Sequence, residues 1–242
     1  MNIFITGGTS GLGLALAQQY ILDGHRVGIC GRDLGKLPAR LTEHALFSSY
    51  KADVVDKEGL FDAMERFSGD IGLDLVIANA GRSVGTKPSI PDFELGREVM
   101  RVNVIGVMNT FEKAMEIMLP KKSGHMVAIS SVAGLVGLPR AGAYCASKAA
   151  VIKLCESMSV DLAVHGINVS AILPGFIDTP LTEINAHPMP FLMSAEKAAK
   201  ITAKAIEDKK VYFIFPRPMK FLILLLEKMP RFLYRWIIKR MH

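Results

Sequence analysis

Cysteine is scarce in this chain of 242 residues: there are three, Cys30, Cys145 and Cys155. They form no CxxC pair and no His/Cys spacing typical of a metal site, so neither a disulfide framework nor a bound metal is expected, and a reducing compartment is favoured. A basic amino-terminal region followed by a long apolar stretch is also missing, because Thr6-Gly7-Gly8 interrupts the first apolar run after five residues. Without a secretion signal, a cytoplasmic location is expected.

An even distribution of charge is missing as well. The net charge of +6 originates in residues 209–242, which carry +8, while the remaining 208 residues sum to −2. A nucleic-acid-binding domain would be basic throughout its folded body, so no nucleic-acid partner is expected. The longest apolar run of this basic segment, Phe221–Leu226, is far shorter than the ~20 residues that span a bilayer.

What the sequence does contain is an alternation of short apolar runs with longer helical patterns. Nearly continuously apolar strands separated by helices predict an α/β fold, a single-domain doubly wound parallel sheet (Rossmann fold) with helices on both faces. We expect this domain to span residues 1–215 and a basic amphipathic tail to follow at 216–242. The predicted strands are Asn2–Thr6, Arg26–Cys30, Phe47–Asp53, Leu73–Asn79, His125–Ser131, Asn168–Pro174 and Val211–Phe215, and the predicted helices are Leu14–Asp23, Leu34–Glu43, Lys57–Phe67, Phe93–Leu119, Ala143–Val164 and Ala195–Asp208.

Ligands of such sheets bind beyond the carboxyl ends of the strands. The first strand is followed by TGGTSGLG, Thr6 to Gly13, which leads into a helix. Absent side chains let the chain turn sharply and let a pyrophosphate lie against backbone N–H groups at the positive end of that helix. An ordinary strand-to-helix turn is the alternative, but the position at the first such junction favours a dinucleotide cofactor.

The end of the second strand bears on which dinucleotide is bound. Chains that prefer the unphosphorylated cofactor usually place a carboxylate there. Here Gly31 and Arg32 occupy the position, and an arginine can bind a 2′-phosphate, so NADP(H) is favoured over NAD(H). The alternative is that Arg32 is solvated and Asp33 binds the ribose. Asp53, after the third strand, is a candidate acceptor for the adenine amino group or a cap of the helix near Lys57.

Tyr144 and Lys148 are i and i+4, so they share one face of a predicted helix. A phenol, with a reference pKa near ~10, exchanges protons poorly at neutral pH unless a nearby cation such as Lys148 lowers that pKa. Alone, such a pair is more often a solvated face than a catalytic site. Together with Ser131 at a strand end and the glycine-rich loop, it indicates catalysis.

The chain resembles the classical short-chain dehydrogenases/reductases over about residues 2 to 180. The resemblance rests on the ordered motifs Thr6-Gly7-x-x-x-Gly11-x-Gly13, Asn79-Ala80-Gly81, Asn103, Ser131, Tyr144-x-x-x-Lys148 and Pro174-Gly175. It implies a Rossmann-fold, NADP(H)-dependent oxidoreductase that interconverts a small-molecule carbonyl and a secondary alcohol by hydride transfer, as a carbonyl reductase or alcohol dehydrogenase.

The resemblance also implies roles for individual residues. Tyr144 would be the general acid or base, and Ser131 would hydrogen-bond the substrate oxygen. Lys148 would hold the nicotinamide ribose and lower the Tyr144 pKa, and Asn103 would anchor a water that relays protons to Lys148. The implied cofactor-binding residues are Thr6, Gly7, Thr9, Ser10, Gly11, Leu12, Gly13, Arg32, Asp53, Val54, Asn79, Ala80, Gly81, Tyr144, Lys148, Pro174, Gly175, Ile177 and Thr179.

Three departures from the family pattern stand out. Ala78 replaces an asparagine that often precedes Asn79-Ala80-Gly81. The segment Pro180–Met193, which usually covers the substrate, looks short and has prolines at 188 and 190, so a more open site is expected. The tail, described below, is the third.

Between Ser131 and Tyr144, the residues expected to give the substrate pocket an apolar lining are Leu135, Val136, Leu138, Pro139 and Arg140.

The tail, which matches no catalytic element, is the third departure. Pro230 should divide it into two short helices. At about 100° per residue its basic side chains gather within an arc of roughly 100°, away from most apolar ones. Such helices either lie peripherally on the inner face of a membrane, which would favour a lipophilic substrate, or pack on this or a partner subunit. The basic residues are Lys220, Lys228, Arg231, Arg235 and Lys239, and the apolar ones are Phe221, Leu225, Met229, Phe232, Leu233 and Trp236.

Apolar surface on the predicted helices 93–119 and 143–164 favours a homodimer, with a homotetramer as the alternative. Two other functions stay open: an NAD(H)-dependent alcohol dehydrogenase, and a nucleotide-binding regulator without turnover. The complete Asn/Ser/Tyr/Lys set argues against the regulator.

Overall fold

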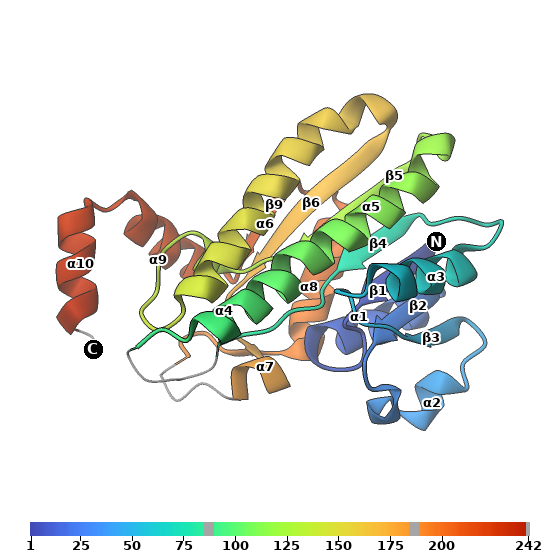
Figure 1. The fold of residues 1–242 in the computed structure, drawn as a ribbon, viewed down its shortest axis with the longest axis horizontal. Coiled ribbons are helices and arrows are strands. Elements are labelled where there is room, and N and C mark those ends of the chain that lie inside the picture. The colour runs from blue at the N-terminus through green and yellow to red at the C-terminus, as the bar shows by residue number, and fades with distance from the viewer. Residues whose placement is uncertain (85–89, 184–188, 241–242) are drawn as a thin grey trace.

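A seven-stranded parallel sheet forms the centre of the protein, which we describe from a computed structural model over residues 1–84, 90–183 and 189–240 (Figure 1). The strand order is β3-β2-β1-β4-β5-β6-β9, so the direction of winding reverses between β1 and β4. The strands are β1 (Asn2–Thr6), β2 (Arg26–Gly31), β3 (Phe47–Lys51), β4 (Leu75–Ala78), β5 (Gly124–Ile129), β6 (Ile167–Pro174) and β9 (Tyr212–Phe215). The predicted doubly wound fold is confirmed.

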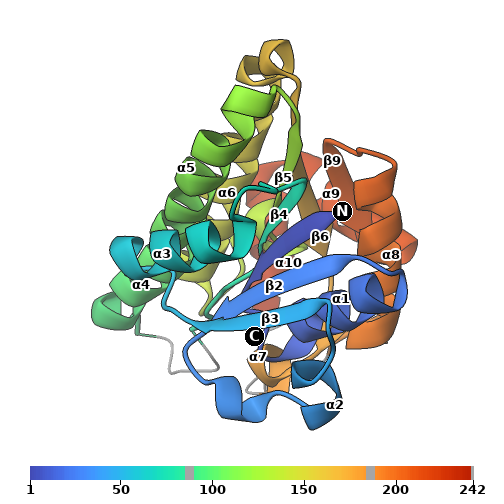
Figure 2. The ribbon, with the colours of Figure 1, turned by 90° about the vertical axis from the view of Figure 1, so that its right-hand side faces the viewer.

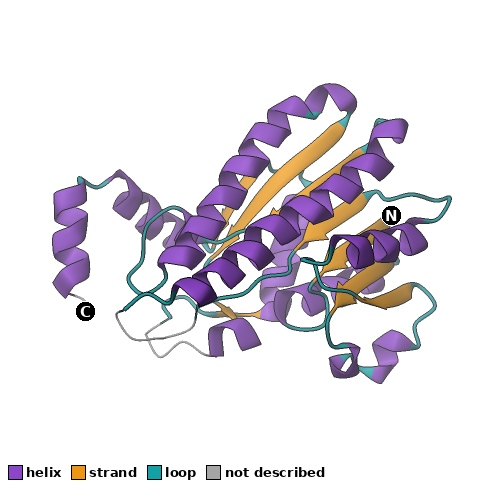
Figure 3. Cartoon of the chain, in the orientation of Figure 1, coloured by secondary structure: helices purple, strands orange, loops and turns teal. Residues whose placement is uncertain are grey.

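Helices cover both faces of the sheet, as Figures 2 and 3 show. On one face lie α1 (Gly11–Leu22) and α8 (Ala195–Glu207), which pack against each other. On the other lie α3 (Lys57–Ser68), α5 (Gly106–Met118) and α6 (Gly142–Asp161). Successive residues of β1 point to opposite faces: Ile3 and Ile5 join the core under α1 and α8, and Phe4 joins the other core.

The prediction of one continuous helix over Leu34–Glu43 is wrong. The structure has a single 3₁₀ turn, η1 (Leu34–Lys36), and a short helix, α2 (Ala39–Thr42). Leu37 between them is extended, with ψ 136°. The cause is Pro38, because a proline ring disfavours helical backbone at the residue before it.

The predicted helix Phe93–Leu119 contains one wide turn. It consists of α4 (Phe93–Met100), the π-helix η2 (Arg101–Ile105) and α5, followed by a 3₁₀ turn, η3 (Leu119–Lys121). The Gly106 N–H donates to the Arg101 carbonyl, five residues back instead of four. Asn103, in the middle of the wide turn, is fully buried.

Shorter elements complete the described chain. They are the 3₁₀ turns η4 (Val132–Gly134) and η5 (Ala163–His165), the short helix α7 (Pro180–Glu183), and a two-stranded sheet of β7 (Ile177–Asp178) and β8 (Met193–Ser194).

The tail forms two helices, α9 (Arg217–Lys228) and α10 (Arg231–Arg240). Met229, before Pro230, is extended at ψ 141°, so the predicted division at that proline is confirmed. Met219, Ile223 and Tyr234 are buried and belong to the core under α3, α5 and α6. No helix among the described residues combines the length and apolar character needed to cross a membrane.

Candidate active site

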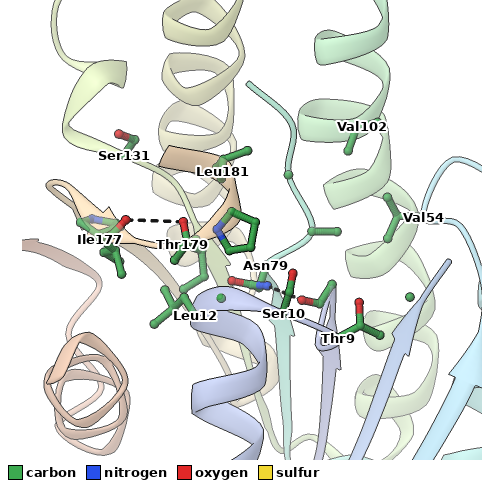
Figure 4. Close-up of a pocket in the computed structure, with 18 of the residues that line it drawn as sticks. Thr9, Ser10, Leu12, Val54, Asn79, Val102, Ser131, Ile177, Thr179 and Leu181 are labelled. Carbon is green, nitrogen blue, oxygen red and sulfur yellow. Dashed lines mark hydrogen bonds between the residues drawn. The ribbon is translucent and has the colours of Figure 1, made fainter. Parts of the chain in front are cut away.

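A cleft of ≈ 280 Å³ opens at the carboxyl ends of the central strands, where the winding reverses (Figure 4). Figure 4 shows Thr9 on one side and Ser131 on the other, with Asn79 between them. Most predicted site residues line it together: Gly7, Thr9, Ser10, Gly11, Leu12, Arg32, Asp53, Val54, Asn79, Ala80, Gly81, Ser131, Tyr144, Lys148, Pro174, Gly175, Ile177 and Thr179. Three predicted residues, Thr6, Gly13 and Asn103, are not part of the lining.

The glycine-rich loop is shaped by close packing. Gly7 has φ +65°, and a Cβ there would lie 2.7 Å from the Ala80 Cα. At Gly13 a Cβ would overlap both the Asn79 side-chain amide and the Gly7 carbonyl. Ser10, at the N-cap of α1, is extended and its side chain caps no N–H of the helix. The first turn of α1 therefore presents its backbone donors at the cleft.

Thr6 and Asn79 join the loop to the end of β4. The Thr6 hydroxyl accepts the N–H groups of Asn79 (3.1 Å) and Ala80 (3.2 Å). In return, the Asn79 side-chain amide donates to the carbonyls of Thr6 (3.1 Å) and Gly7 (3.0 Å). Thr6 is 1% exposed, so it holds the loop in shape from below the cleft.

Arg32 and Asp33 differ in where they lie. Arg32 is exposed and lines the cleft just after β2. The Asp33 carboxylate accepts the Gly35 N–H at 3.0 Å and pairs with Lys36 at 3.5 Å. Asp33 thus begins the η1 turn and lies outside the lining of the cleft.

Asp53 lines the cleft, and its Oδ1 accepts the Val55 N–H at 3.0 Å. The alternative that it caps α3 is wrong. Asp56 is the N-cap residue, and its Oδ1 accepts the Gly59 N–H at 3.3 Å.

Ser131, Tyr144 and Lys148 converge from two elements. Ser131 lies two residues after the end of β5, and its hydroxyl oxygen accepts the Ala133 N–H at 3.1 Å. Tyr144 and Lys148 lie in the first two turns of α6, with the Lys148 Nζ 5.8 Å from the centre of the Tyr144 ring. Lys148 is 4% exposed and donates to the Ile129 carbonyl at 2.9 Å.

Burial has the largest effect on the pKa values of Tyr144 and Lys148. Burial raises the pKa of Tyr144 to about 12, although a hydrogen bond with Ser131 opposes the rise. Burial also lowers the pKa of Lys148 to about 8. The expected lowering of the Tyr144 pKa by Lys148 is therefore not found in the protein alone, because removal from water outweighs the other effects.

Asn103 links the elements around Tyr144 and Lys148 by hydrogen bonds. Its Oδ1 accepts the Arg82 N–H at 2.8 Å, and its Nδ2 donates to the Arg82 carbonyl (3.0 Å) and the Ser147 hydroxyl (2.9 Å). Ser147 in turn donates to the Tyr144 carbonyl at 2.7 Å. The amide thus fixes the segment after β4, the π turn and α6, while the predicted water relay to Lys148 stays a prediction.

Comparison with known proteins identifies the family. The family model described as short chain dehydrogenase matches residues 1–189. The chain belongs to this family. An uncharacterized oxidoreductase of Myxococcus xanthus is 36% identical over 217 residues, which cover 88% of this chain and 86% of that one. Two solved structures have a similar fold: ElxO with NADP bound (TM-score 0.78, 25% identity, 88% and 95% covered) and a Burkholderia phymatum short chain dehydrogenase/reductase in complex with NAD (TM-score 0.84, 23% identity, 94% and 93% covered).

In this short-chain dehydrogenase, the loop before α6 packs against the core. Val136 is buried, and Leu135 and Leu138 pack against the same core. None of the residues 135–140 lines this cleft, so the predicted apolar lining from this loop stays a prediction. Helix α9 brings Met219 and Ile223 into the same core.

Several lining residues were not predicted: Cys30, Gly31, Ala52, Val102, Ile129, Ser130, Pro180, Leu181 and Thr182. Most are chain neighbours of predicted residues, so extending each strand-end motif by one or two positions would have found them. Val102 comes from the π turn and has no local signal. Of the segment expected to cover the substrate, residues 184–188, including the proline at 188, lie outside the described residues.

Proposed function

We propose that this short-chain dehydrogenase is an NADP(H)-dependent oxidoreductase that interconverts a carbonyl and a secondary alcohol, with Tyr144 as general acid and base. The observation that carries the proposal is the convergence of Ser131, Tyr144 and Lys148 on the cleft whose lining also includes the glycine-rich loop and Arg32. Lys148 would also serve a cleft that only bound nucleotide, but such a cleft would not need Ser131 and Tyr144 together beside it.

The cleft fits a dinucleotide. Its glycines keep the backbone bare, and the α1 donors lack a side-chain cap, so a pyrophosphate can bind there. Lys148 would hold the nicotinamide ribose, Asp53 the adenine and Thr179 the carboxamide. When bound, NADP(H) supplies or accepts the hydride.

The protein residues would manage the proton and the developing charge. A raised pKa keeps Tyr144 protonated at neutral pH, as a proton donor to a carbonyl oxygen must be. The Ser131 hydroxyl accepts from the Ala133 N–H and hydrogen-bonds Tyr144, so it would turn its hydrogen from Tyr144 to the substrate oxygen. Lys148, with a pKa of about 8, can exchange protons near neutral pH and resupply Tyr144.

Tyr144→Phe tests the proposal, because it removes the proton donor and keeps the ring. We expect the rate of NADPH-dependent reduction of apolar ketones to fall by roughly 10²–10⁴-fold. The dissociation constant for NADPH, measured by cofactor fluorescence, should stay unchanged. Tyr50→Phe, which lies outside the cleft lining, is the matched control. Retained turnover in Tyr144→Phe would refute the mechanism, and a wild-type protein that binds NADPH but reduces no ketone would favour the regulator.

The preference for NADP(H) is supported by Arg32 and Asp33. Arg32 lines the cleft, whereas the Asp33 carboxylate contacts Gly35 and Lys36 and lies outside the lining. Arg32→Ala should weaken NADPH binding by roughly 10–100-fold, since an ion-assisted hydrogen bond contributes about 1.5–3 kcal/mol, and should change NADH binding little. Titrations with each cofactor measure this, with Arg97→Ala as a control. Equal losses for both cofactors would contradict the assignment.

The finer features of substrate and assembly are also proposals. A lipophilic substrate is supported by Leu181 in the lining and by the exposed Phe191 and Leu192 before β8. A homodimer, or a homotetramer that contains it, is supported by the exposed apolar side chains of α4, η2 and α5: Phe93, Met100, Ile105 and Met108. A cytoplasmic location is supported by three buried cysteines that are free thiols.

A further inference from the structure

The tail helices are fixed to the body of the protein beside the cleft. Met219 and Pro216 pack on Gly175, which lines the cleft. Helix α9 also contacts η4, the turn that follows Ser131. In α10 the Tyr234 hydroxyl donates to the Gly137 carbonyl at 2.5 Å. The inward side chains of the tail therefore hold both helices next to the loop between Ser131 and Tyr144.

The outward side chains of the same helices are large and apolar. Phe221 of α9 is 75% exposed, and Phe232 and Trp236 of α10 are 77% and 52% exposed. Figure 1 shows α10 standing away from the sheet and its covering helices. Clusters of exposed aromatic and aliphatic residues of this kind mark surfaces that bind something. We define the tail surface as the exposed apolar residues Phe221, Leu222, Leu225, Phe232, Leu233 and Trp236 with the basic residues around them.

The charge of α9 and α10 is almost entirely positive. The two helices carry seven lysines and arginines and one glutamate, a net charge of +6 that equals the charge of the whole chain. All seven cations are exposed, and none pairs with a carboxylate among the described residues. They are Arg217, Lys220, Lys228, Arg231, Arg235, Lys239 and Arg240.

We infer that the tail surface docks on an anionic lipid bilayer. Lysines and arginines would meet the headgroups while Phe221, Phe232 and Trp236 enter the headgroup–acyl boundary. A second copy of this chain is a poorer occupant, because a symmetric contact would bring two faces of charge +6 together. Nucleic acid would satisfy the cations and leave the apolar side chains in water.

Docking would place the cleft near the membrane surface. Gly175 lines the cleft, Gly137 lies in the loop between the lining residues Ser131 and Tyr144, and both contact the tail directly. If the proposed function holds, a lipophilic carbonyl or alcohol dissolved in the bilayer could reach the cleft without crossing bulk water; this consequence rests on that function, whereas the docking does not.

Vesicle binding by the full-length chain tests the docking. We expect co-sedimentation with vesicles of phosphatidylcholine and phosphatidylglycerol (7:3), little with pure phosphatidylcholine, and release by high salt. Trp236 is the single tryptophan of the chain, so its emission reports on the tail surface alone. It should shift to shorter wavelength with the anionic vesicles. Equal binding to both kinds of vesicle, or no binding to either, would overturn the inference.

Matched variants separate the tail surface from the net charge. Lys228→Glu/Arg235→Glu should weaken binding roughly tenfold or more, and Phe221→Ser/Phe232→Ser should remove the fluorescence shift. These side chains are exposed, so folding should be spared. Lys197→Glu/Lys200→Glu, on exposed positions of α8, changes the net charge equally and should bind as wild type. Equal losses in this control would overturn the inference.

Two further readouts distinguish the other outcomes. The first is light scattering. If wild type binds no vesicles and is an oligomer that the tail variants convert to a monomer, the tail surface is an interface between copies and the inference is wrong. NADPH titration of the same samples is independent of lipid. A protein that binds anionic vesicles but not NADPH would keep this inference and refute the proposed function.

Discussion

At the scale of single residues, Lys148 is a cation buried almost completely. It is 4% exposed, and burial lowers its pKa to about 8 from a usual value of 10.5. Between these two values the unfolded chain holds a proton that the folded protein has lost, so stability rises with pH across this window. Below about pH 8 the full cost of burying the charge is present. Lys148→Met should therefore be inactive yet more stable than wild type at pH 7, by up to about 3 kcal/mol.

Urea denaturation of both proteins at pH 7 and pH 10 measures this difference, which should shrink at the higher pH. Lys113→Met is the matched control. Burial alone would lower the Lys113 pKa, but hydrogen bonds to Glu65 and Glu116 outweigh it and raise that pKa. Its stabilising contribution is present at neutral pH and lost as the pH rises through the raised value. Lys113→Met should thus be less stable than wild type at pH 7. If Lys148→Met lowered the free energy of unfolding as much as Lys113→Met does, burial of the Lys148 cation would carry no cost.

At the scale of elements, the junction between β1 and β4 depends on the Thr6 hydroxyl. Thr6→Val keeps the shape of the side chain but leaves the Asn79 and Ala80 N–H groups without their acceptor. We expect a loss of about 1–3 kcal/mol in the free energy of unfolding and weaker NADPH binding, because the glycine-rich loop is no longer held.

Thr6→Ser retains the acceptor and should behave nearly as wild type. Thermal unfolding and NADPH titration of both variants give the comparison. If the Thr6→Val and Thr6→Ser variants bind NADPH equally well, the Thr6 hydroxyl does not shape the glycine-rich loop.

The elements themselves were largely predictable because apolar periodicity reports local backbone geometry. The break at Pro38 could have been read from the sequence, since the restriction on Leu37 is local. The π turn at Arg101–Ile105 could not, because one wide turn barely alters a 3.6-residue pattern and its buried Asn103 bonds to residues 82 and 147, far away in the chain.

The candidate site was predictable where each residue follows its own strand, as Arg32 and Ser131 do. It was not predictable where orientation depends on a distant partner. Val136 turns into the core because α9, more than eighty residues later, supplies apolar neighbours there. The role of Thr6 beneath the loop likewise depends on Asn79 and Ala80, which only the fold brings near.

At the scale of the whole molecule, one hydrogen bond joins residues 97 positions apart in the chain. Tyr234→Phe removes the donor to the Gly137 carbonyl and should lower the free energy of unfolding by about 0.5–1.5 kcal/mol. Hydrogen exchange in residues 132–143 should become faster, because the loop loses a fixed contact. Tyr212→Phe, at the exposed edge strand, is the control. Unchanged exchange in Tyr234→Phe would show that α10 does not restrain the loop.

The packing of α8 on α1 matters for anyone who recombines genes of this family. The family match ends at residue 189, before α8 begins at Ala195. A hybrid gene spliced at that boundary would inherit every motif of the cleft from one parent, yet α8, which covers one sheet face together with α1, would come from the other. Ala198, Ala199 and Thr202, all at most 1% exposed, would then have to match a foreign α1 surface. The piece that the family model matches is shorter than the piece that folds, so splice sites should be chosen from the contacts of α8, not from the end of that match.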